Sequence, residues 1–268
     1  MDKRPIGVFD SGMGGLTCVK EVMKVMPGED VIYFGDTGRL PYGSRGADTI
    51  VKYVRQDIRF LRTFDIKMII IACGTASSAA LPWLADELDT DVLGVVEPAV
   101  KRAAAATKNG RIGVLGTAGT VRSGKYVEYI KNIDSGISVF QKACPMFVPL
   151  VENGYSGSEV TRIIAKEYLD EVKAAGVDTL ILGCTHYPLL KNVIRGIMGD
   201  GVTLIDSGAA AADYAYEKLR DADMLSGEKS GTVKYFVSDT VDGFEQLGGM
   251  FLEQPISGSV ERIDIEKY

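Results

Sequence analysis

Two cysteines in this chain have matching sequence surroundings. Cys73 follows the apolar run 69–72, and Cys184 follows the run 180–183. In both places a polar residue and the expected start of a helix come next. The repetition predicts that each thiol lies at the carboxyl end of a strand and at the beginning of a helix. One such corner stands in each half of the chain.

A thiol at the N-terminal end of a helix lies in an environment that favours its ionised form. The helix dipole and the free backbone N–H groups lower the pKa of a cysteine there. A lone buried cysteine is more often a small apolar side chain, which is the interpretation we favour for Cys18 and Cys144. The matched pair Cys73 and Cys184 is instead predicted to act on a substrate.

Two thiols facing a substrate from opposite sides suit a reaction that inverts a carbon centre. One thiolate removes a proton from one face, and the other thiol returns a proton to the opposite face. A carbanion formed beside a carboxylate needs hydrogen-bond donors aimed at that carboxylate. Ser11, Thr75 and Thr185 are placed to supply them. The pattern therefore predicts inversion at the α-carbon of an amino acid.

No cofactor motif is complete, and we predict no cofactor. Gly12 to Thr17 fails the dinucleotide fingerprint, because Thr17 stands where the last Gly or Ala belongs. The stretch 119–126 has most of a phosphate-binding loop, but Tyr126 occupies the position of the Ser or Thr that contacts magnesium. The four cysteines lack metal-ligand spacing and His186 is the single histidine, so no metal is expected. Pyridoxal phosphate leaves no reliable local signature.

The composition is that of an ordinary soluble protein. Of the 268 residues, 46% are apolar and 25% are charged, and the net charge of -6 argues against nucleic-acid or membrane partners. The longest apolar run, 68–73, is too short to cross a bilayer. No secretion signal is recognised, and four widely spaced cysteines suggest free thiols. We therefore expect a cytoplasmic protein.

Strands and helices are expected to alternate along the chain. Strands are predicted at 6–9, 31–34, 68–72, 111–115, 179–182, 202–205, 233–238 and 260–265. Helices are predicted at 16–26, 49–64, 75–88, 158–175 and 241–251. This alternation predicts an α/β protein with mainly parallel sheets, whose functional residues gather at the carboxyl ends of the strands.

Short polar clusters follow several other strands as well. They are Asp10-Ser11-Gly12, Gly35-Asp36-Thr37, Gly116-Thr117 and Asp206-Ser207-Gly208. Any one of them is explained by turn and helix-cap chemistry. The presence of cysteine at two equivalent places favours a functional site at the carboxyl ends of the strands.

Four motifs, in this order, resemble those of the glutamate racemases in the cofactor-independent aspartate/glutamate racemase superfamily. They are Asp10-Ser11-Gly12-Met13-Gly14-Gly15, Pro41-Tyr42-Gly43, Cys73-x-Thr75-Ala76 and Gly183-Cys184-Thr185-His186-Tyr187-Pro188. The resemblance extends from Ile6 to about Asp206. His186 resembles the glutamate branch, because aspartate racemases usually have an acidic residue there.

The resemblance implies two similar α/β domains with the active site in the cleft between them. The first would comprise residues 1–98 and 208–268, and the second residues 99–207. The implied activity is the interconversion of L- and D-glutamate, which supplies D-glutamate for peptidoglycan synthesis and so for cell shape. The resemblance also implies a homodimer with glutamate as its small-molecule substrate.

The resemblance implies a role for each of several residues. Cys73 and Cys184 would be the acid and base, assisted by Asp10, His186 and Glu152. The implied substrate-binding residues are Asp10, Ser11, Tyr42, Gly43, Gly74, Thr75, Thr185 and His186. Chemically, Asp10 could accept from the substrate ammonium, and His186 could orient Cys184. Structural alternatives remain for three of them: Asp10 as a helix cap, Glu152 as a solvated loop acid and Tyr42 as a residue that packs a turn.

Gly74 departs from the family pattern, in which Asn usually follows the first cysteine. Glycine removes an amide that would bind substrate, but it leaves the backbone N–H available and permits close approach of the chain. Racemisation of aspartate or another small amino acid is therefore an alternative. A cysteine hydrolase would need a base beside its thiol, and Cys73 has no histidine near it in sequence. A non-catalytic amino-acid-binding module would not need two matching thiols.

Overall fold

The computed structural model describes residues 1–84, 91–256 and 260–268, which form two parallel sheets. The six-stranded sheet has the order β10-β9-β2-β1-β3-β4. Its strands are β1 (Ile6–Asp10), β2 (Val31–Gly35), β3 (Met68–Ile71), β4 (Asp91–Gly94), β9 (Val233–Val237) and β10 (Val260–Arg262). The four-stranded sheet has the order β6-β5-β7-β8. Its strands are β5 (Arg111–Gly116), β6 (Ser138–Ala143), β7 (Thr179–Leu182) and β8 (Thr203–Asp206).

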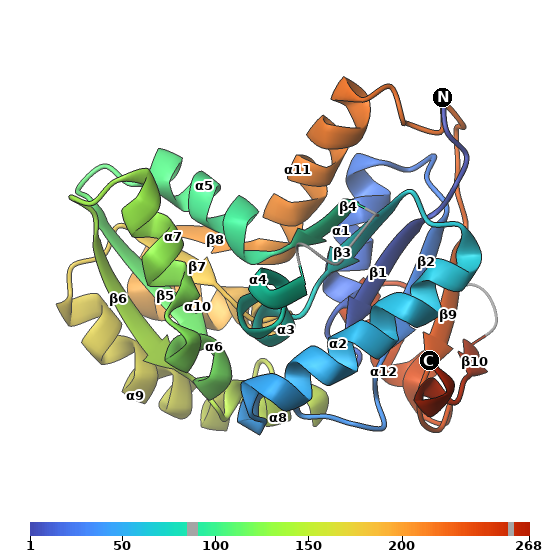
Figure 1. Cartoon of the computed structure of the whole chain (residues 1–268). Coiled ribbons are helices and arrows are strands. Elements are labelled where there is room, and N and C mark those ends of the chain that lie inside the picture. The colour runs from blue at the N-terminus through green and yellow to red at the C-terminus, as the bar shows by residue number, and fades with distance from the viewer. Residues whose placement is uncertain (85–90, 257–259) are drawn as a thin grey trace.

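Helices lie over both sheets and connect their strands (Figure 1). They are α1 (Leu16–Val25), α2 (Ala47–Leu61), α3 (Gly74–Ala79), α4 (Leu81–Leu84), α5 (Val96–Ala106), α6 (Ala118–Ser123), α7 (Lys125–Ile133), α8 (Phe147–Glu152), α9 (Glu159–Ala174), α10 (Lys191–Met198), α11 (Ser207–Asp221) and α12 (Phe244–Leu252). Short 3₁₀ helices are η1 (Tyr42–Ser44), η2 (Arg62–Phe64), η4 (Tyr187–Leu190) and η5 (Ile265–Lys267). None of the described helices has the length and apolar character that a membrane span requires.

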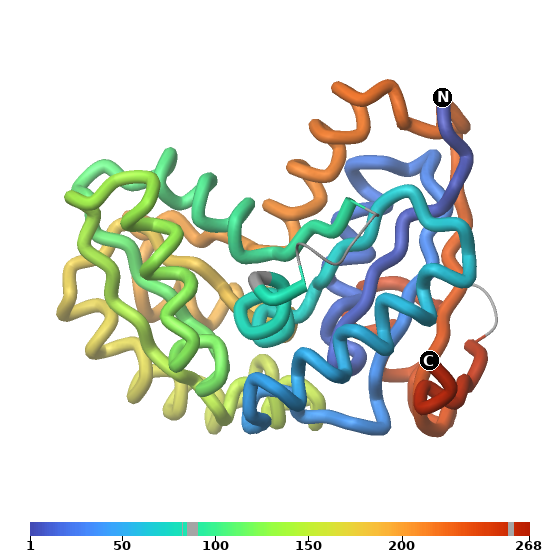
Figure 2. The backbone as a smooth tube through the Cα atoms, in the orientation of Figure 1, coloured from blue at the N-terminus to red at the C-terminus, as the bar shows by residue number. Residues whose placement is uncertain are grey.

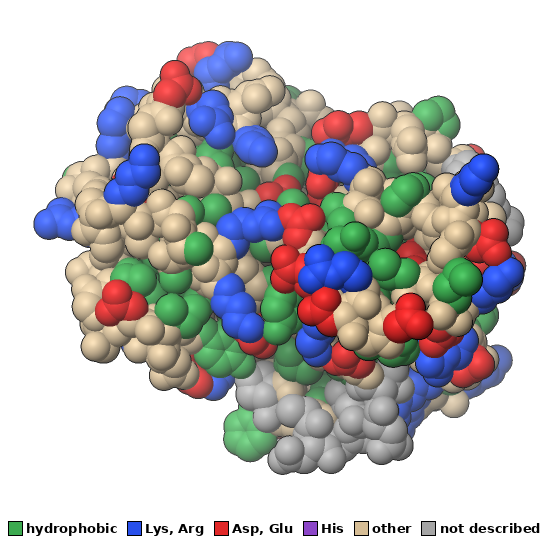
Figure 3. Space-filling model, turned by 90° about the horizontal axis from the view of Figure 1, so that it is seen from above, with side chains coloured by type: hydrophobic (Ala, Val, Ile, Leu, Met, Phe, Trp, Pro, Cys, Tyr) green, Lys and Arg blue, Asp and Glu red, His purple; other side chains and the backbone are tan. Residues whose placement is uncertain are grey.

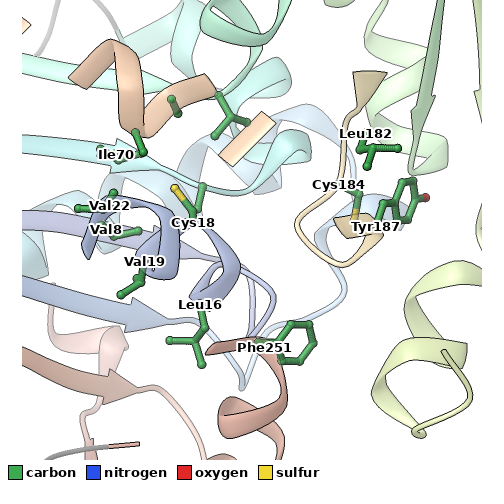
Figure 4. Packing of buried hydrophobic residues seen from close by; sticks show 14 of the residues in the cluster. Val8, Leu16, Cys18, Val19, Val22, Ile70, Leu182, Cys184, Tyr187 and Phe251 are labelled. Carbon is green, nitrogen blue, oxygen red and sulfur yellow. The ribbon is translucent and has the colours of Figure 1, made fainter. Parts of the chain in front are cut away.

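The predicted fold class is confirmed, because every described strand pairing is parallel. Strands β1, β3 and β7 are buried along their whole length, as their continuous apolar sequences predict. Helix α1 packs on the first sheet with Cys18 among apolar neighbours such as Val8 and Ile70 (Figure 4). Cys18 is therefore a small core side chain, as expected.

The predicted helix at 75–88 is the clearest local error. Helix α3 ends at Ala79 and α4 occupies Leu81–Leu84, while residues 85–88 lie outside the described part of the chain. Pro82 lacks the N–H that would continue the first helix, which explains why one long helix does not form. In the predicted helix 49–64, α2 ends at Leu61 and the last residues form the 3₁₀ helix η2.

The chain passes from the first sheet to the second through α5 and returns through α11. These two helices pack against each other, and α11 also packs on α1. Both chain ends lie in the half of the molecule that holds the six-stranded sheet (Figure 2). The predicted boundary between residues 98 and 99 falls inside α5, and the boundary at 208 falls at the start of α11. The division into 1–98 with 208–268 and 99–207 stays a prediction.

Candidate active site

A cavity of about 630 Å³ lies where the carboxyl ends of strands from the two sheets meet. The lining residues include those that follow β1, β3, β5 and β7. Every site residue predicted from the sequence is among them. They are Asp10, Ser11, Tyr42, Gly43, Cys73, Gly74, Thr75, Glu152, Cys184, Thr185 and His186. The structure therefore brings both cysteine corners to one cavity, one from each sheet.

Cys73 is buried at the N-terminal end of α3. Its Sγ accepts from the backbone N–H of Ala76 at 3.4 Å and lies 3.6 Å from Ser11 Oγ. Burial raises the pKa of Cys73 to about 12, and the charge of Asp10 adds to this effect. The expectation that the helix end lowers the pKa of this thiol is therefore wrong, because one N–H bond on a short helix does not offset burial. Cys73 is a thiol at neutral pH.

Cys184 has a different neighbourhood, which His186 and Glu152 create. Sγ of Cys184 lies 3.9 Å from His186 Nδ1, and His186 Nε2 lies 2.9 Å from Glu152 Oε1. Burial disfavours a charge on the ring, but the hydrogen bonds to Cys184 and Glu152 outweigh it and raise the pKa of His186 to about 10. A cationic imidazole therefore lies beside the second thiol at neutral pH.

The second corner does not begin an α-helix directly. Residues after Cys184 turn into the 3₁₀ helix η4, and Pro188 lies in its first turn, whereas the α-helix α10 begins only at Lys191. The predicted resemblance between the two corners thus holds for the strand and the thiol but not for the helix type. His186 supplies the positive charge that a helix end was expected to supply.

Asp10 lines the cavity and has one carboxylate oxygen without a hydrogen-bond partner among the described residues. Its Oδ2 accepts from the backbone N–H groups of Gly12 at 3.2 Å and Gly15 at 3.0 Å. Its buried Oδ1 has no hydrogen-bond partner among the described residues. Burial raises the pKa of Asp10, while the charge of His186 and the backbone N–H bonds oppose this. The carboxyl group thus orders the loop before α1 and keeps one acceptor for a bound cation such as an ammonium group.

The sequence and the fold have known counterparts. Residues 17–215 match the Asp/Glu/Hydantoin racemase family. The chain belongs to this family. A glutamate racemase of Geobacter metallireducens is 46% identical over 267 residues, which are 99% of this chain and 98% of that protein. The resemblance to the glutamate racemases, and with it an isomerase that acts on amino acids, is confirmed.

Solved structures of glutamate racemases share the whole fold. An isoform from Bacillus anthracis superimposes with a TM-score of 0.95 at 35% identity and covers 98% of both chains. The enzyme of Francisella tularensis, solved in complex with D-glutamate, gives a TM-score of 0.92 at 36% identity over 100% of both chains. The arrangement of two parallel sheets around the cavity is thus shared with these racemases.

Glycines let the two halves of this racemase-family fold touch beside the cavity. A Cβ atom at Gly74 would lie 2.3 Å from the carbonyl oxygen of Gly183, and one at Gly119 would lie 2.8 Å from that of Gly43. Real Cβ atoms essentially never lie closer than 3.0 Å to a non-bonded heavy atom. The close approach expected for Gly74 is therefore present, and its partner is the residue that precedes Cys184.

A cluster of three hydroxyl groups joins the two halves at the same wall. Thr75 Oγ1 lies 2.9 Å from Thr117 Oγ1 and 3.3 Å from Thr120 Oγ1, and the last two are 3.1 Å apart. Thr117 lines the cavity but was not predicted as a site residue. Its position directly after β5, in the cluster Gly116-Thr117, was the signal that could have identified it.

Several other lining residues were not predicted either, among them Arg122 and Cys144. Arg122 on α6 is an exposed cation in the cavity lining. Cys144 is buried as expected, but it also lines the cavity, so the view of it as a core side chain alone is incomplete. The segment 119–126 spans α6 and the start of α7 and fully buries Tyr126, so it forms no phosphate-binding loop. Within the described ranges, no group of His, Cys, Asp or Glu could hold a metal ion.

Proposed function

We propose that this protein interconverts L- and D-glutamate without a cofactor and uses Cys73 and Cys184 as its paired acid and base. The observation that carries the proposal is that two thiols from different sheets line one cavity in unequal electrostatic surroundings. Cys184 lies next to a cationic imidazole, whereas burial and Asp10 keep Cys73 protonated. This is the arrangement that one thiolate and one thiol need.

In one direction, the Cys184 thiolate removes the α-proton and Cys73 delivers its own proton to the opposite face. The product leaves Cys184 as a thiol and Cys73 as a thiolate, and the reverse reaction uses these states. The substrate ammonium would bind Asp10, whose charge adds to burial in raising the pKa of Cys73, and would cancel that charge. Substrate binding would thus ease ionisation of Cys73 when the opposite enantiomer reacts.

The substrate carboxylates need donors, and the lining supplies several. Hydroxyl groups come from Ser11, Thr75 and Thr185, while Arg122 adds a positive charge at the cavity lining. Glutamate is favoured because similar proteins bear the name glutamate racemase and one was solved with D-glutamate. Aspartate or another small amino acid remains the second candidate, because Gly74 lacks the amide that family members usually have there.

We further propose a cellular role on the family resemblance alone. D-glutamate made by this protein would serve peptidoglycan synthesis in the cytoplasm, and the protein would act as a homodimer. No nucleic acid or membrane would take part.

The test is incubation with L-glutamate in deuterated water. We expect D-glutamate to form with deuterium at the α-carbon, and we expect Cys73→Ala and Cys184→Ala each to lower the rate by at least about a thousandfold. Cys18→Ala is the matched control, since Cys18 is buried outside the cavity lining and its change should leave racemisation intact. Full activity of either cavity variant contradicts the two-thiol mechanism. Turnover of L-aspartate without turnover of L-glutamate would favour the second candidate.

A further inference from the structure

The hydroxyl group of Tyr42 lies between two buried carboxyl groups. Tyr42 begins η1 and lines the cavity, yet its side chain is almost fully buried. Its Oη makes a short contact with Asp36 Oδ2 and lies 3.0 Å from Asp57 Oδ2. Both aspartates are fully buried. The site residue Tyr42 is therefore held from behind by two acids that do not line the cavity.

Counting protons shows that one of these acids must be neutral. A phenol has one proton and can donate it to one carboxylate oxygen only. If both aspartates were ionised, the second oxygen would face the phenol oxygen with no proton between them. Such a contact between two acceptors, buried away from water, would be strongly unfavourable. A carboxylic acid O–H that donates to the phenol oxygen removes the conflict.

The donors around the two acids show which of them carries the proton. Both oxygens of Asp36 already accept from donors: Ser238 donates to Oδ1 at 2.8 Å, and the Arg39 Nε–H donates to Oδ2 at 2.7 Å, besides the contact with Tyr42. Asp57 Oδ1 accepts from Arg39 Nη2 at 2.9 Å. Among the residues that the structure describes, only the phenol oxygen of Tyr42 lies within hydrogen-bond distance of Asp57 Oδ2. This Oδ2 is the atom that is free to carry a proton.

The charge balance of the cluster agrees with one neutral acid. The guanidinium of Arg39 faces both aspartates and lies 4.2 Å from the ring centre of Tyr53. Glu266 contributes a more exposed carboxylate 3.5 Å from Arg39 Nη1. Burial raises the pKa of Asp57 well above its usual value, and the charge of Asp36 raises it further, whereas Arg39 opposes both. One ionised aspartate beside one arginine leaves no surplus buried charge.

We propose that Asp57 is protonated in the folded protein and donates this proton to Tyr42, while Tyr42 donates to Asp36. Asp57 is then a positioning residue: it fixes the tyrosine and, through it, the backbone of Gly43, which packs against Thr117 of the other half. The catalytic consequence rests on the proposed function, because Tyr42 and Gly43 are proposed to bind the substrate. The location of the proton does not depend on that function.

The first experiment compares the thermal stability of wild type and Asp57→Asn across pH. An amide copies the neutral acid, since it donates to Tyr42 and accepts from Arg39. Unfolding of the wild type exposes an ordinary aspartate, which releases its proton above about pH 4. The contribution of Asp57 to the stability of the wild type therefore falls as pH rises, whereas the amide of the variant does not titrate. We expect the difference in unfolding temperature, variant minus wild type, to increase as the pH is raised from about 5 to about 8.

A level profile between about pH 5 and about pH 8 would overturn the proposal. If Asp57 were ionised and paired with Arg39, its pKa would lie below the usual value, and the unfolding temperature of Asp57→Asn relative to wild type would change with pH only below about pH 4. Asp178→Asn is a control for an ionised aspartate. Burial disfavours ionisation of Asp178, but hydrogen bonds from Thr107 and from the backbone of Asn109 and Lys108 together lower its pKa. The unfolding temperature of this variant relative to wild type should therefore stay level between about pH 5 and about pH 8.

The second experiment measures racemisation of L-glutamate and separates KM from kcat. We expect Asp57→Asn to keep KM within about twofold of wild type, whereas Asp57→Ala, which removes the donor, should raise KM about tenfold with a smaller change in kcat. Equal losses in the amide and alanine variants would overturn the positioning role. If the wild type does not racemise glutamate, the proposed function fails, while the stability experiment still locates the proton.

Discussion

At the scale of single residues, the two thiols differ more than their sequences indicate. The identity of the chemical groups was readable because cysteine, aspartate and threonine directly follow strands, and parallel strands bring their carboxyl ends together. The protonation states of the two thiols could not be predicted from the sequence. They depend on burial of Cys73 and on the contact of His186 with Glu152, which comes from a distant part of the chain. Only the folded chain determines these surroundings.

His186 offers a prediction about pH. Its pKa of about 10 means that the folded protein binds a proton which the unfolded chain releases above about pH 6.5. The contribution to stability is fully present below about pH 6.5 and is lost as pH rises through about 10. We expect His186→Asn to lack this alkaline loss and to lower kcat/KM at least about tenfold, because the Cys184 thiolate loses its cation.

Thermal unfolding between about pH 6 and about pH 10.5, together with alkylation rates of Cys184, measures both effects. Cys184 in the asparagine variant should react more slowly at neutral pH, because no cation then lies beside its Sγ. A parallel alkaline decline in both proteins would show that the imidazole is neutral, and the assigned role of His186 would then be wrong.

At the scale of elements, buried strands were predicted best because continuous apolar runs identify them. The edge strand β6 was missed, since its residues are partly exposed and mix polar with apolar types. Helix α11 was missed because no helix was assigned after Asp206-Ser207-Gly208, although helix-cap chemistry was one interpretation of that cluster. In the structure Asp206 caps this helix and accepts from Gly208 and Ala209. Cys144 and Arg122 escaped prediction because the segments that carry them, after β6 and on α6, were not assigned.

The contact between the two cysteine corners gives a prediction about Gly74. A methyl group there would overlap the carbonyl oxygen of Gly183, which is backbone and has little freedom to move. We expect Gly74→Ala to force the corners apart, to lower kcat about tenfold and to destabilise the protein by about 1–3 kcal/mol. Steady-state kinetics and thermal unfolding measure these changes.

Gly196→Ala is the matched control for this substitution. A Cβ atom at Gly196, within α10, would have no heavy atom within 4 Å apart from its chain neighbours and the nearby backbone of its own helix. Replacing a glycine inside a helix by alanine should stabilise the protein by up to about 1 kcal/mol and leave kinetics unchanged. If Gly74→Ala behaved like this control, the close packing of the two corners would have no functional importance.

At the scale of the whole molecule, the sequence predicted parallel sheets but not how they face each other. That relation arises from contacts between distant segments, such as Thr17 Oγ1 with the carbonyl oxygen of Thr185 at 2.9 Å, and from α11 packing on both α1 and α5. Neither has a local sequence signal. The resemblance to a known family, rather than periodicity, implied two domains around a cleft.

The net charge of -6 repels an anionic substrate. On the face in Figure 3, Lys and Arg are more frequent toward the upper left, whereas acidic and basic side chains lie side by side toward the right. Arg122 is the only arginine or lysine among the described lining residues of the cavity. Since exposed charges act over about 10 Å at 0.1 M salt, one arginine at this place can offset the repulsion locally.

We therefore expect Arg122→Gln to raise KM for L-glutamate about three- to tenfold at low salt, with little change in kcat. The difference from wild type should shrink as salt rises to about 0.5 M, because added ions screen both the repulsion and the lost attraction. Arg262→Gln changes the net charge equally but lies on the exposed strand β10 outside the cavity lining, so its KM should match wild type. A KM effect of Arg122→Gln that persists unchanged at high salt would instead indicate a direct hydrogen bond to the bound substrate.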